Sequence, residues 1–156
     1  MSDHRPATDV SVREATNNDL VAVRSLLESA HLPVDGLEDY FGPAYAVAEC
    51  DGRVVGAEGI EKHGGSGLLR SAVVDDRYRG RGVGDLLTRD RLAWAQASGL
   101  DEVWLLTTTA AEYFPRFGFT LADRAAAPDA LQQSVEFRDA CPASAVAMRL
   151  TLENMK

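Results

Sequence analysis

The spacing of hydrophobic residues along the chain switches between two periods, and these predict strands and helices in turn. The segment VSVRE near the start alternates as a half-buried strand does, whereas Val83, Leu86, Leu87 and Leu92 recur at helical spacing. Alternating or short continuous apolar segments predict strands over residues 10–14, 44–49, 53–61, 68–74, 102–107, 119–122 and 143–152. Helical spacing predicts helices over residues 20–30, 83–97 and 110–116, with shorter helical segments near 37–41 and 129–133.

Turn-forming residues mark the boundaries between these segments. Asp51-Gly52 is a two-residue hairpin signal, residues 63–67 are expected to form the next turn, and Pro33 follows the first long helix. The interleaved order of strands and helices predicts an α/β fold with a single mixed central sheet flanked by helices. With 156 residues the chain is expected to be one domain over its whole length, with residues 1–9 frayed.

Composition excludes several classes of protein. A net charge of -8 argues against nucleic acid as a partner, because a phosphate backbone requires a basic face. No run approaches the roughly 18 apolar residues of a membrane span, and no signal-peptide core opens the chain, so we expect a cytoplasmic protein. The two cysteines, Cys50 and Cys141, lack metal-ligand spacing and are expected to be reduced and buried rather than paired or nucleophilic.

One stretch joins an apolar strand, a glycine-rich turn and an amphipathic helix. The turn consists of Arg79, Gly80, Arg81, Gly82, Val83 and Gly84. Glycines let the backbone approach a ligand, and the first amides of a helix lie at the positive end of its dipole. The turn therefore predicts an anion site, with a plain strand-to-helix connection as the alternative. Gly84 is followed by Asp85 rather than by the lysine of a P-loop, so this is a different kind of phosphate site.

Two motifs in this order resemble those of a known family. Arg79, Gly82 and Gly84 fill the pattern Q/R-x-x-G-x-G/A, and residues 112–119 (EYFPRFGF) follow beyond an intervening strand. Together they resemble motifs A and B of the GNAT acetyltransferases, over residues 10–152. The resemblance implies the GNAT fold, an N-acetyltransferase activity, acetyl-CoA as co-substrate and no metal.

The resemblance also implies where acetyl-CoA would bind. In the family two central strands splay apart around the pantetheine arm, which here would lie against Val73, Val74, Leu106 and Thr107. The pyrophosphate is expected on the amides of residues 79–84. The backbone amide of Val74 is the expected donor to the oxyanion that forms during transfer.

Two positions depart from the family pattern. Phe114 stands where many members carry a tyrosine that protonates the thiolate, and its phenyl ring has no proton to donate. The thiolate is then expected to leave unassisted or to take a proton from water, while Phe114 remains a candidate cofactor contact. Thr107 stands where members often have an asparagine that contacts CoA, and its hydroxyl can replace that contact.

Three residues are candidates for the base that deprotonates the acceptor amine. Glu58 lies in the middle of a predicted strand between small residues, an unusual place for a charge, and we favour it, acting directly or through water. Glu61 is three residues later and should point to the opposite face, so the carboxylate that does not face the cleft is expected to be solvated. His63 is the competitor because its unperturbed pKa suits a base, unless it is only a turn residue.

The acceptor is suggested by three further stretches, residues 68–71, 105–110 and 136–146. They resemble the acetyltransferases of arsenic-resistance operons, and the Leu-Thr-Thr run is also similar to the acetyltransferase domain of N-acetylglutamate synthases. Both comparisons imply a small amino-acid-like molecule with an amine. A guanidinium binds two oxygens of a carboxylate or oxyacid, so Arg70, with Ser71 beside it, and Arg138 are candidate substrate-binding residues.

The leading hypothesis is therefore an acetyl-CoA-dependent N-acetyltransferase for a small amino-acid-like amine, possibly in toxin or arsenical resistance. One alternative is the acetylation of a cationic amine or a protein N-terminus, which an acidic surface would attract. Another is a non-catalytic module that binds acetyl-CoA. A homodimer is common in the family, but no stretch of the sequence identifies an interface.

Overall fold

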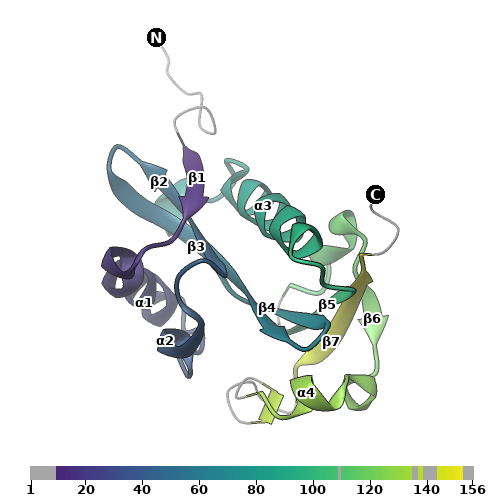
Figure 1. The fold of residues 1–156 in the computed structure, drawn as a ribbon. Helices are drawn as coiled ribbons and strands as arrows, with labels where there is room; N and C mark the ends of the chain where they lie inside the picture. The colour runs from purple at the N-terminus through teal and green to yellow at the C-terminus, as the bar shows by residue number, and fades with distance from the viewer. Residues whose placement is uncertain (1–9, 109, 135–136, 139–143, 153–156) are drawn as a thin grey trace. The chain divides into compact units, whose positions relative to one another are not determined.

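The protein is built on a seven-stranded sheet with the strand order β1-β2-β3-β4-β5-β7-β6 (Figure 1). The coordinates are a computed structural model, which describes residues 10–108, 110–134, 137–138 and 144–152. β4 and β5 pair in parallel, whereas β1 with β2, β2 with β3, β5 with β7 and β6 with β7 pair antiparallel. The predicted mixed sheet is confirmed.

The elements follow the predicted order. The strands are β1 (Ser11–Glu14), β2 (Tyr45–Cys50), β3 (Arg53–His63), β4 (Ser66–Val74), β5 (Glu102–Thr107), β6 (Thr120–Ala122) and β7 (Val146–Thr151). The α-helices are α1 (Leu20–Ser29), α2 (Leu37–Tyr40), α3 (Val83–Ala97) and α4 (Asp129–Gln132). Short 3-10 helices are η2 (Asn17–Asp19), η3 (Asp76–Tyr78), η4 (Phe114–Phe117) and η5 (Arg124–Ala126). No helix in these described ranges is long and apolar enough to cross a membrane.

The turn between β3 and β4 is shorter than predicted. His63 belongs to β3 and Ser66 begins β4, so the turn that was expected over residues 63–67 is reduced to its middle. Gly67 lies in β4, where a Cβ would stand 2.7 Å from Ile60 and 3.0 Å from Leu100. The sequence was misleading here because this glycine permits close packing rather than a turn.

The helix predicted over residues 110–116 is a shorter 3-10 helix, η4 (Phe114–Phe117). Pro115 fits near the start of a helix, where a missing N–H costs nothing. Gly118 ends the helix with a left-handed φ of 102°. The predicted hairpin turn is confirmed, since Asp51 and Gly52 both have a left-handed φ, 52° and 76°.

The contacts divide the chain into two compact units. The first consists of Met1–Gly59 with Ser71–Leu92, and the second of Ile60–Arg70 with Ala93–Lys156. Strands β3 and β4 and helix α3 each run from one unit into the other. Each unit has a hydrophobic core of its own.

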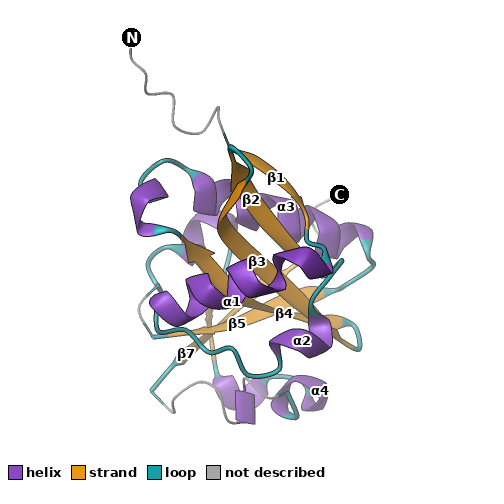
Figure 2. Cartoon of the chain, turned by 90° about the vertical axis from the view of Figure 1, so that its left-hand side faces the viewer, coloured by secondary structure: helices purple, strands orange, loops and turns teal. Residues whose placement is uncertain are grey.

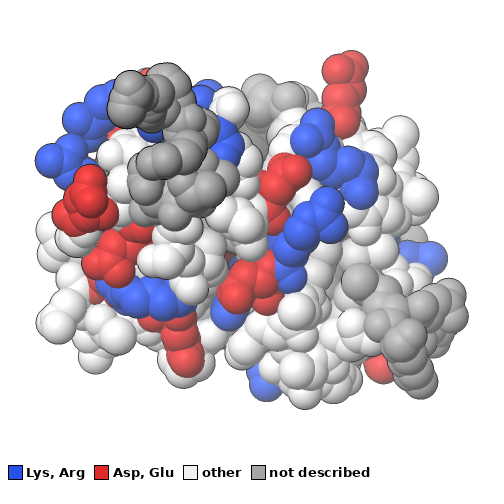
Figure 3. Space-filling model, turned by 90° about the horizontal axis from the view of Figure 1, so that it is seen from above, with Lys and Arg blue, Asp and Glu red and all other residues white. Residues whose placement is uncertain are grey.

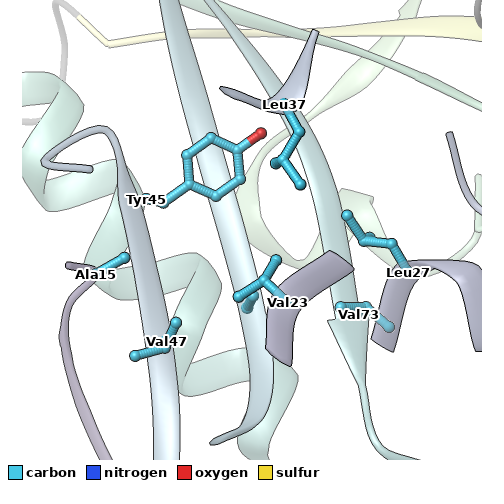
Figure 4. Close-up of a cluster of buried hydrophobic side chains, with 8 residues drawn as sticks. Ala15, Val23, Leu27, Leu37, Tyr45, Val47 and Val73 are labelled. Atoms are coloured by element: carbon cyan, nitrogen blue, oxygen red, sulfur yellow. The ribbon is translucent and has the colours of Figure 1, made fainter. Parts of the chain in front are cut away.

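In the first unit the strands are covered on both faces. One core joins α1 and α2 to the sheet and is drawn in Figure 4; it consists of Ala15, Val23, Leu27, Leu37, Tyr45, Val47, Ala57 and Val73. The other joins α3 to the opposite face through Ala46, Ala48, Val55, Val83 and Leu87. Successive strand residues point to opposite faces, so neighbours such as Ala46 and Val47 serve different cores. Figure 2 shows α1 in front of these strands and α3 behind them.

The second unit packs its core against β4, β5 and β7. The cluster consists of Leu68, Trp104, Leu106, Ala127, Leu131, Phe137, Ala145 and Ala147. β5 is buried along its apolar run, as its unbroken hydrophobic sequence predicts for a central strand. Trp104 and Leu106 of β5 belong to this cluster, so the strand that leads to Thr107 packs into the core of the second unit.

Candidate active site

The glycine-rich turn has the geometry of an open anion cradle. Gly80 and Gly82 adopt left-handed φ angles of 78° and 81°, and a Cβ at either position would meet no atom within 4 Å. The backbone over this turn is therefore accessible to a ligand. Leu86 is the residue whose amide bonds back to Gly82, at 3.1 Å, so the amides of the first turn of α3 have no acceptor within the helix. These features fit a phosphate or pyrophosphate.

The two arginines of the turn are held in different ways. The Arg79 guanidinium is exposed and lies 3.1 Å from the Asp76 carboxylate and 3.5 Å from the Val74 carbonyl oxygen. The Arg81 guanidinium lies over the Tyr78 ring, 5.2 Å from its centroid. Both positive charges stay at the surface beside the turn, where they add to the helix dipole.

Of the four strand positions expected beside the pantetheine arm, two side chains are buried and two are partly exposed. In the first unit Val73 is buried in the core with α1, and Val74 packs partly against the core with α3. In the second unit Leu106 is buried, and the Thr107 hydroxyl accepts a hydrogen bond of 2.9 Å from the Ala110 amide. The hydroxyl that was expected to contact CoA thus also holds the turn after β5.

The pairing of β4 with β5 covers only some of β5. The parallel register runs from Ser66 opposite Glu102 to Leu68 opposite Trp104, which accounts for three of the six residues of β5. On its other edge β5 pairs with β7 along its entire length, up to Thr107 opposite Val146. The parallel pairing of β4 with β5 therefore ends before Leu105.

Phe114 is buried, begins η4 and belongs to a group of aromatic rings around this helix. Its ring makes edge contacts with Tyr113 at 5.1 Å and with Phe119 at 5.7 Å between centroids. The Tyr113 ring also contacts Phe117 and the Arg116 guanidinium. Phe114 therefore has a packing role that is independent of any cofactor.

Glu58 is the most unusual ionisable group of the first unit. Its side chain is buried, and its Oε1 accepts a hydrogen bond of 2.8 Å from the Thr88 hydroxyl of α3. Its Oε2 is buried without a hydrogen-bond partner among the described residues. Burial raises the pKa of Glu58 to about 8, against the lowering effects of Thr88 and of the Arg91 charge. A carboxyl with this pKa can exchange a proton near neutral pH.

Glu61 does not behave as predicted for the second carboxylate of β3. We expected it to be solvated if Glu58 faced the site, but it is 2% exposed. Its Oε2 accepts a hydrogen bond of 3.0 Å from Arg70, and its Oε1 lies 3.0 Å from Nε2 of His63. Spacing could not reveal this network, because the arginine comes from a neighbouring strand. Arg70 thus has the buried partner that a buried guanidinium requires.

Ser71 follows Arg70 and has a backbone conformation that sequence gives no reason to expect. Its φ is 61° in the middle of β4, and its hydroxyl lies 3.1 Å from the Tyr45 hydroxyl of β2. Sequence reasoning missed Tyr45, and it also missed Thr88. A threonine on the same helical stripe as Leu92 was the available signal for the latter.

The remaining candidates contribute less to the sites described above. Arg138 is exposed, and its amide donates to the Ser134 carbonyl oxygen at 3.0 Å. Cys50 is buried and has a free thiol, whereas Cys141 and most of the stretch 136–146 lie outside the described residues. Over the portion of the chain that is described, no group of three or more His, Cys, Asp or Glu side chains is placed to hold a metal.

Comparison with known proteins gives a family match and a shared fold. A family model described as an acetyltransferase (GNAT) domain matches residues 42–121, just over half of the chain of 156 residues. A search of curated proteins found no match to the sequence. Among solved structures, the N-acetylglutamate synthase of Neisseria gonorrhoeae with coenzyme A and N-acetyl-glutamate has a TM-score of 0.79 at 19% identity. That match covers 93% of this chain and 35% of the synthase chain.

Two further solved structures match along nearly their whole length. Rv2747 from Mycobacterium tuberculosis, in complex with CoA, has a TM-score of 0.78 at 23% identity, over 91% of this chain and 99% of its own. A protein of Arabidopsis thaliana, solved with the bisubstrate analogue CoA-Ac-MVNAL, has a TM-score of 0.69 at 19% identity, over 92% and 99%. The chain spans about a third of the length of the synthase chains that it matches. These three solved structures share the predicted fold with this chain.

Proposed function

Because the chain belongs to the GNAT family of acetyl-CoA-dependent N-acetyltransferases, we propose that it acetylates the amine of a small amino-acid-like acceptor. The observation that carries the cofactor site is the cradle of residues 79–84, whose left-handed glycines leave the backbone open in front of α3. Acetyl-CoA supplies the activated acetyl thioester. The amides of the cradle would hold its pyrophosphate, with the Arg79 guanidinium beside them.

The strand that leads into the cradle would orient the reacting group. Val74 ends β4, and its backbone amide would donate to the acetyl oxygen as that oxygen gains negative charge. The buried side chain of Val73 keeps this end of β4 anchored to the core with α1. On β5, Leu106 and Thr107 are the proposed contacts of the pantetheine arm, with Phe114 as a further contact, in keeping with the family pattern.

Glu58 is the proposed base. Its raised pKa suits the removal of a proton from an ammonium group. Its Oε2, which has no hydrogen-bond partner among the residues that the structure describes, is the atom available to accept that proton. Its side chain is 1% exposed, so the proton would reach it through water rather than by direct contact. His63 is the competitor, and its Nε2 is already placed against Glu61.

The proposal of an amino-acid-like acceptor rests on the sequence stretches around Arg70 and Ser71, with Arg138 as a further candidate. Arg70 is paired with Glu61, so an acceptor carboxylate would meet a guanidinium whose charge is already balanced. The synthase of Neisseria gonorrhoeae was solved with N-acetyl-glutamate. At 19% identity this similarity supports a shared fold but not the identity of the acceptor. We further propose a place in the arsenic-resistance branch, and a homodimer, on sequence resemblance alone.

A second candidate acceptor is a cationic amine or a peptide N-terminus. The net charge of -8 favours it, because an acidic protein attracts cations. One observation argues against a broad acidic field: on one face of the molecule, acidic and basic side chains lie close together (Figure 3). The Arabidopsis thaliana protein, solved with a bisubstrate analogue of CoA and a peptide, is the corresponding structural neighbour.

The test is the release of free thiol from acetyl-CoA with a panel of amines. The panel contains amino acids, phosphinothricin-like and arsenical analogues, polyamines and short peptides. Selective turnover of amino acids or their analogues would support the proposal, and turnover only of polyamines or peptides would replace the acceptor. Binding of acetyl-CoA by calorimetry without thiol release from any amine would contradict the proposal and favour a non-catalytic acetyl-CoA-binding module.

A further inference from the structure

Three arginines lie in or next to the glycine-rich turn, and aspartates balance the charge of two of them. The Arg77 guanidinium lies 3.0 Å from the Asp75 carboxylate, and the Arg79 guanidinium lies 3.1 Å from the Asp76 carboxylate. Among the residues that the structure describes, no carboxylate lies within ion-pair distance of the Arg81 guanidinium. Of these three arginines, Arg81 is therefore the one whose positive charge is available to a ligand.

The sequence around Arg81 gives no reason to expect this. Three aspartates, Asp75, Asp76 and Asp85, lie within six residues of it, in a chain with a net charge of -8. An exposed arginine has a long flexible side chain, with which it can reach such carboxylates. The Arg81 guanidinium instead lies over the Tyr78 ring, 5.2 Å from its centroid. The ring thus takes the place that an acidic partner would otherwise have.

Tyr78 is itself held from the side of the protein core. It is the last residue of η3, and it packs against the core with α3, to which Cys50 and Val83 belong. The neighbouring Cys50 thiol, and then burial, raise the pKa of Tyr78, so its phenol is neutral near pH 7. A neutral aromatic ring attracts a guanidinium through its quadrupole. It therefore orders the side chain of Arg81 without cancelling its charge.

Arg81 lies between Gly80 and Gly82, the two left-handed glycines that open the cradle. Its charge is thus carried by the same short turn as the amides that are proposed to hold the pyrophosphate. From this arrangement we infer that Tyr78 is a positioning residue of the cofactor site, whose ring holds the Arg81 guanidinium beside the cradle to pair with the pyrophosphate of acetyl-CoA. The inference rests on the proposed function and names the two side chains that would give the cradle its net charge.

The experiment is a double-mutant cycle of Tyr78→Met and Arg81→Gln, in which calorimetry on the full chain measures the affinity for acetyl-CoA. Methionine fills much of the space of the ring but has no aromatic face. Arg81→Gln should weaken binding by about tenfold, because it removes the charge, and Tyr78→Met by about threefold, because it removes only the ordering of that charge. The double variant should bind no more weakly than Arg81→Gln alone, since Tyr78 acts through Arg81.

Three controls separate positioning from a structural role. Tyr78→Phe keeps the ring and should bind acetyl-CoA as the wild type does. Arg24→Gln changes the net charge by the same amount on α1, which covers the opposite face of the strands from α3, and should change the affinity less than about twofold (Figure 2). Added salt should reduce the effects of both Arg81→Gln and Tyr78→Met, because ions screen an exposed charge. A loss of affinity that comes from disturbed packing would not be screened in this way.

Three results would overturn the inference and leave the proposed function intact. They are wild-type affinity in Arg81→Gln, an equal loss from Tyr78→Met with and without the Arg81 charge, and a loss in Tyr78→Phe as large as in Tyr78→Met. If Tyr78→Met does not fold, the NMR signal of the Arg81 Nε–H group decides, because in the wild type it should be shifted by the ring and should move when acetyl-CoA binds. A signal that shows neither effect would also overturn the inference. A wild type that does not bind acetyl-CoA would refute the proposed function and the inference with it.

Discussion

Thr88 donates a hydrogen bond of 2.8 Å to Oε1 of Glu58, and Oε2 of the same carboxyl is buried without a partner among the described residues. Burial raises the pKa of Glu58 to about 8, with Thr88 and Arg91 acting in the opposite direction and Asp90 in the same one. At neutral pH most molecules therefore carry a neutral Glu58. This pair of residues therefore links the protonation state of the first unit to pH near neutrality.

The first prediction concerns activity. If Glu58 is the base, kcat/KM should rise about tenfold per pH unit below pH 8 and level off above it, because only the carboxylate accepts a proton. Glu58→Gln should lower kcat/KM by about 100-fold or more and abolish this limb. Thr88→Val should shift the limb to higher pH, since the Thr88 hydrogen bond lowers the pKa. An unchanged limb in Glu58→Gln would exclude Glu58 as the base.

The second prediction concerns stability. Near pH 4 the carboxyl is protonated in the folded and in the unfolded chain, so its titration contributes nothing to the pH dependence. Between the ordinary value of 4.5 and about 8 the unfolded chain releases a proton that the folded chain keeps. The free energy of unfolding of the wild type should therefore fall by about 1.4 kcal/mol per pH unit over this window and become constant above it.

The Glu58→Gln side chain has no proton to release. The unfolding free energy of this variant should therefore increase relative to that of the wild type as pH rises. Between pH 5 and pH 9 the difference in unfolding free energy should change by about 4 kcal/mol in favour of the variant. Urea denaturation at several pH values measures this difference. A difference that stays constant with pH would show that the pKa of Glu58 is not raised.

The third prediction separates binding from backbone strain at the cradle. Gly82 and Gly52 both have a left-handed φ, 81° and 76°, and both have open space where a Cβ would be. Replacing either by alanine should cost about 1 kcal/mol of unfolding free energy, because alanine is strained at such angles. Only Gly82→Ala should weaken acetyl-CoA binding, by about tenfold or more, as measured by calorimetry. Equal affinities for acetyl-CoA in the two variants would show that the cradle is not part of the cofactor site.

Sequence predicted the features that depend on neighbouring residues and missed those that depend on distant ones. The hairpin at Asp51-Gly52 and the glycine turn before α3 are local, because residue type fixes the backbone angles there. The Arg70–Glu61 ion pair joins different strands, and the strained φ of Ser71 is stabilised by tertiary contacts, so neither has a local signal. The odd position of Glu58 was visible as a charge between small residues, but its pairing with Thr88, 30 residues further along the chain, was not.

The fourth prediction concerns the buried ion pair of the second unit. The Arg70 and Glu61 side chains are 1% and 3% exposed and lie 3.0 Å apart. Arg70→Ala should lower the unfolding free energy by about 3 to 5 kcal/mol, because Glu61 is left buried with its main counter-ion removed. Arg70→Met with Glu61→Leu should recover most of this loss. A test of Arg70 in acceptor binding therefore needs the double variant as its stability control, and equal stability of all three proteins would contradict the pairing.

The fifth prediction concerns the space that Gly59 leaves for Tyr45. The two residues are register partners on β3 and β2, and a Cβ on Gly59 would lie 2.4 Å from the phenol ring, closer than atoms can approach. Gly59→Ala should therefore cost about 1 to 3 kcal/mol of unfolding free energy, because the ring must move within a packed core. In a Tyr45→Ala background the same substitution meets no ring, so its cost should fall to a few tenths of a kcal/mol. Urea denaturation of the four proteins gives the coupling directly. A cost of Gly59→Ala that is the same in both backgrounds would mean that the ring does not fill this space, and the hydroxyl pair of Tyr45 and Ser71 would then lose its support.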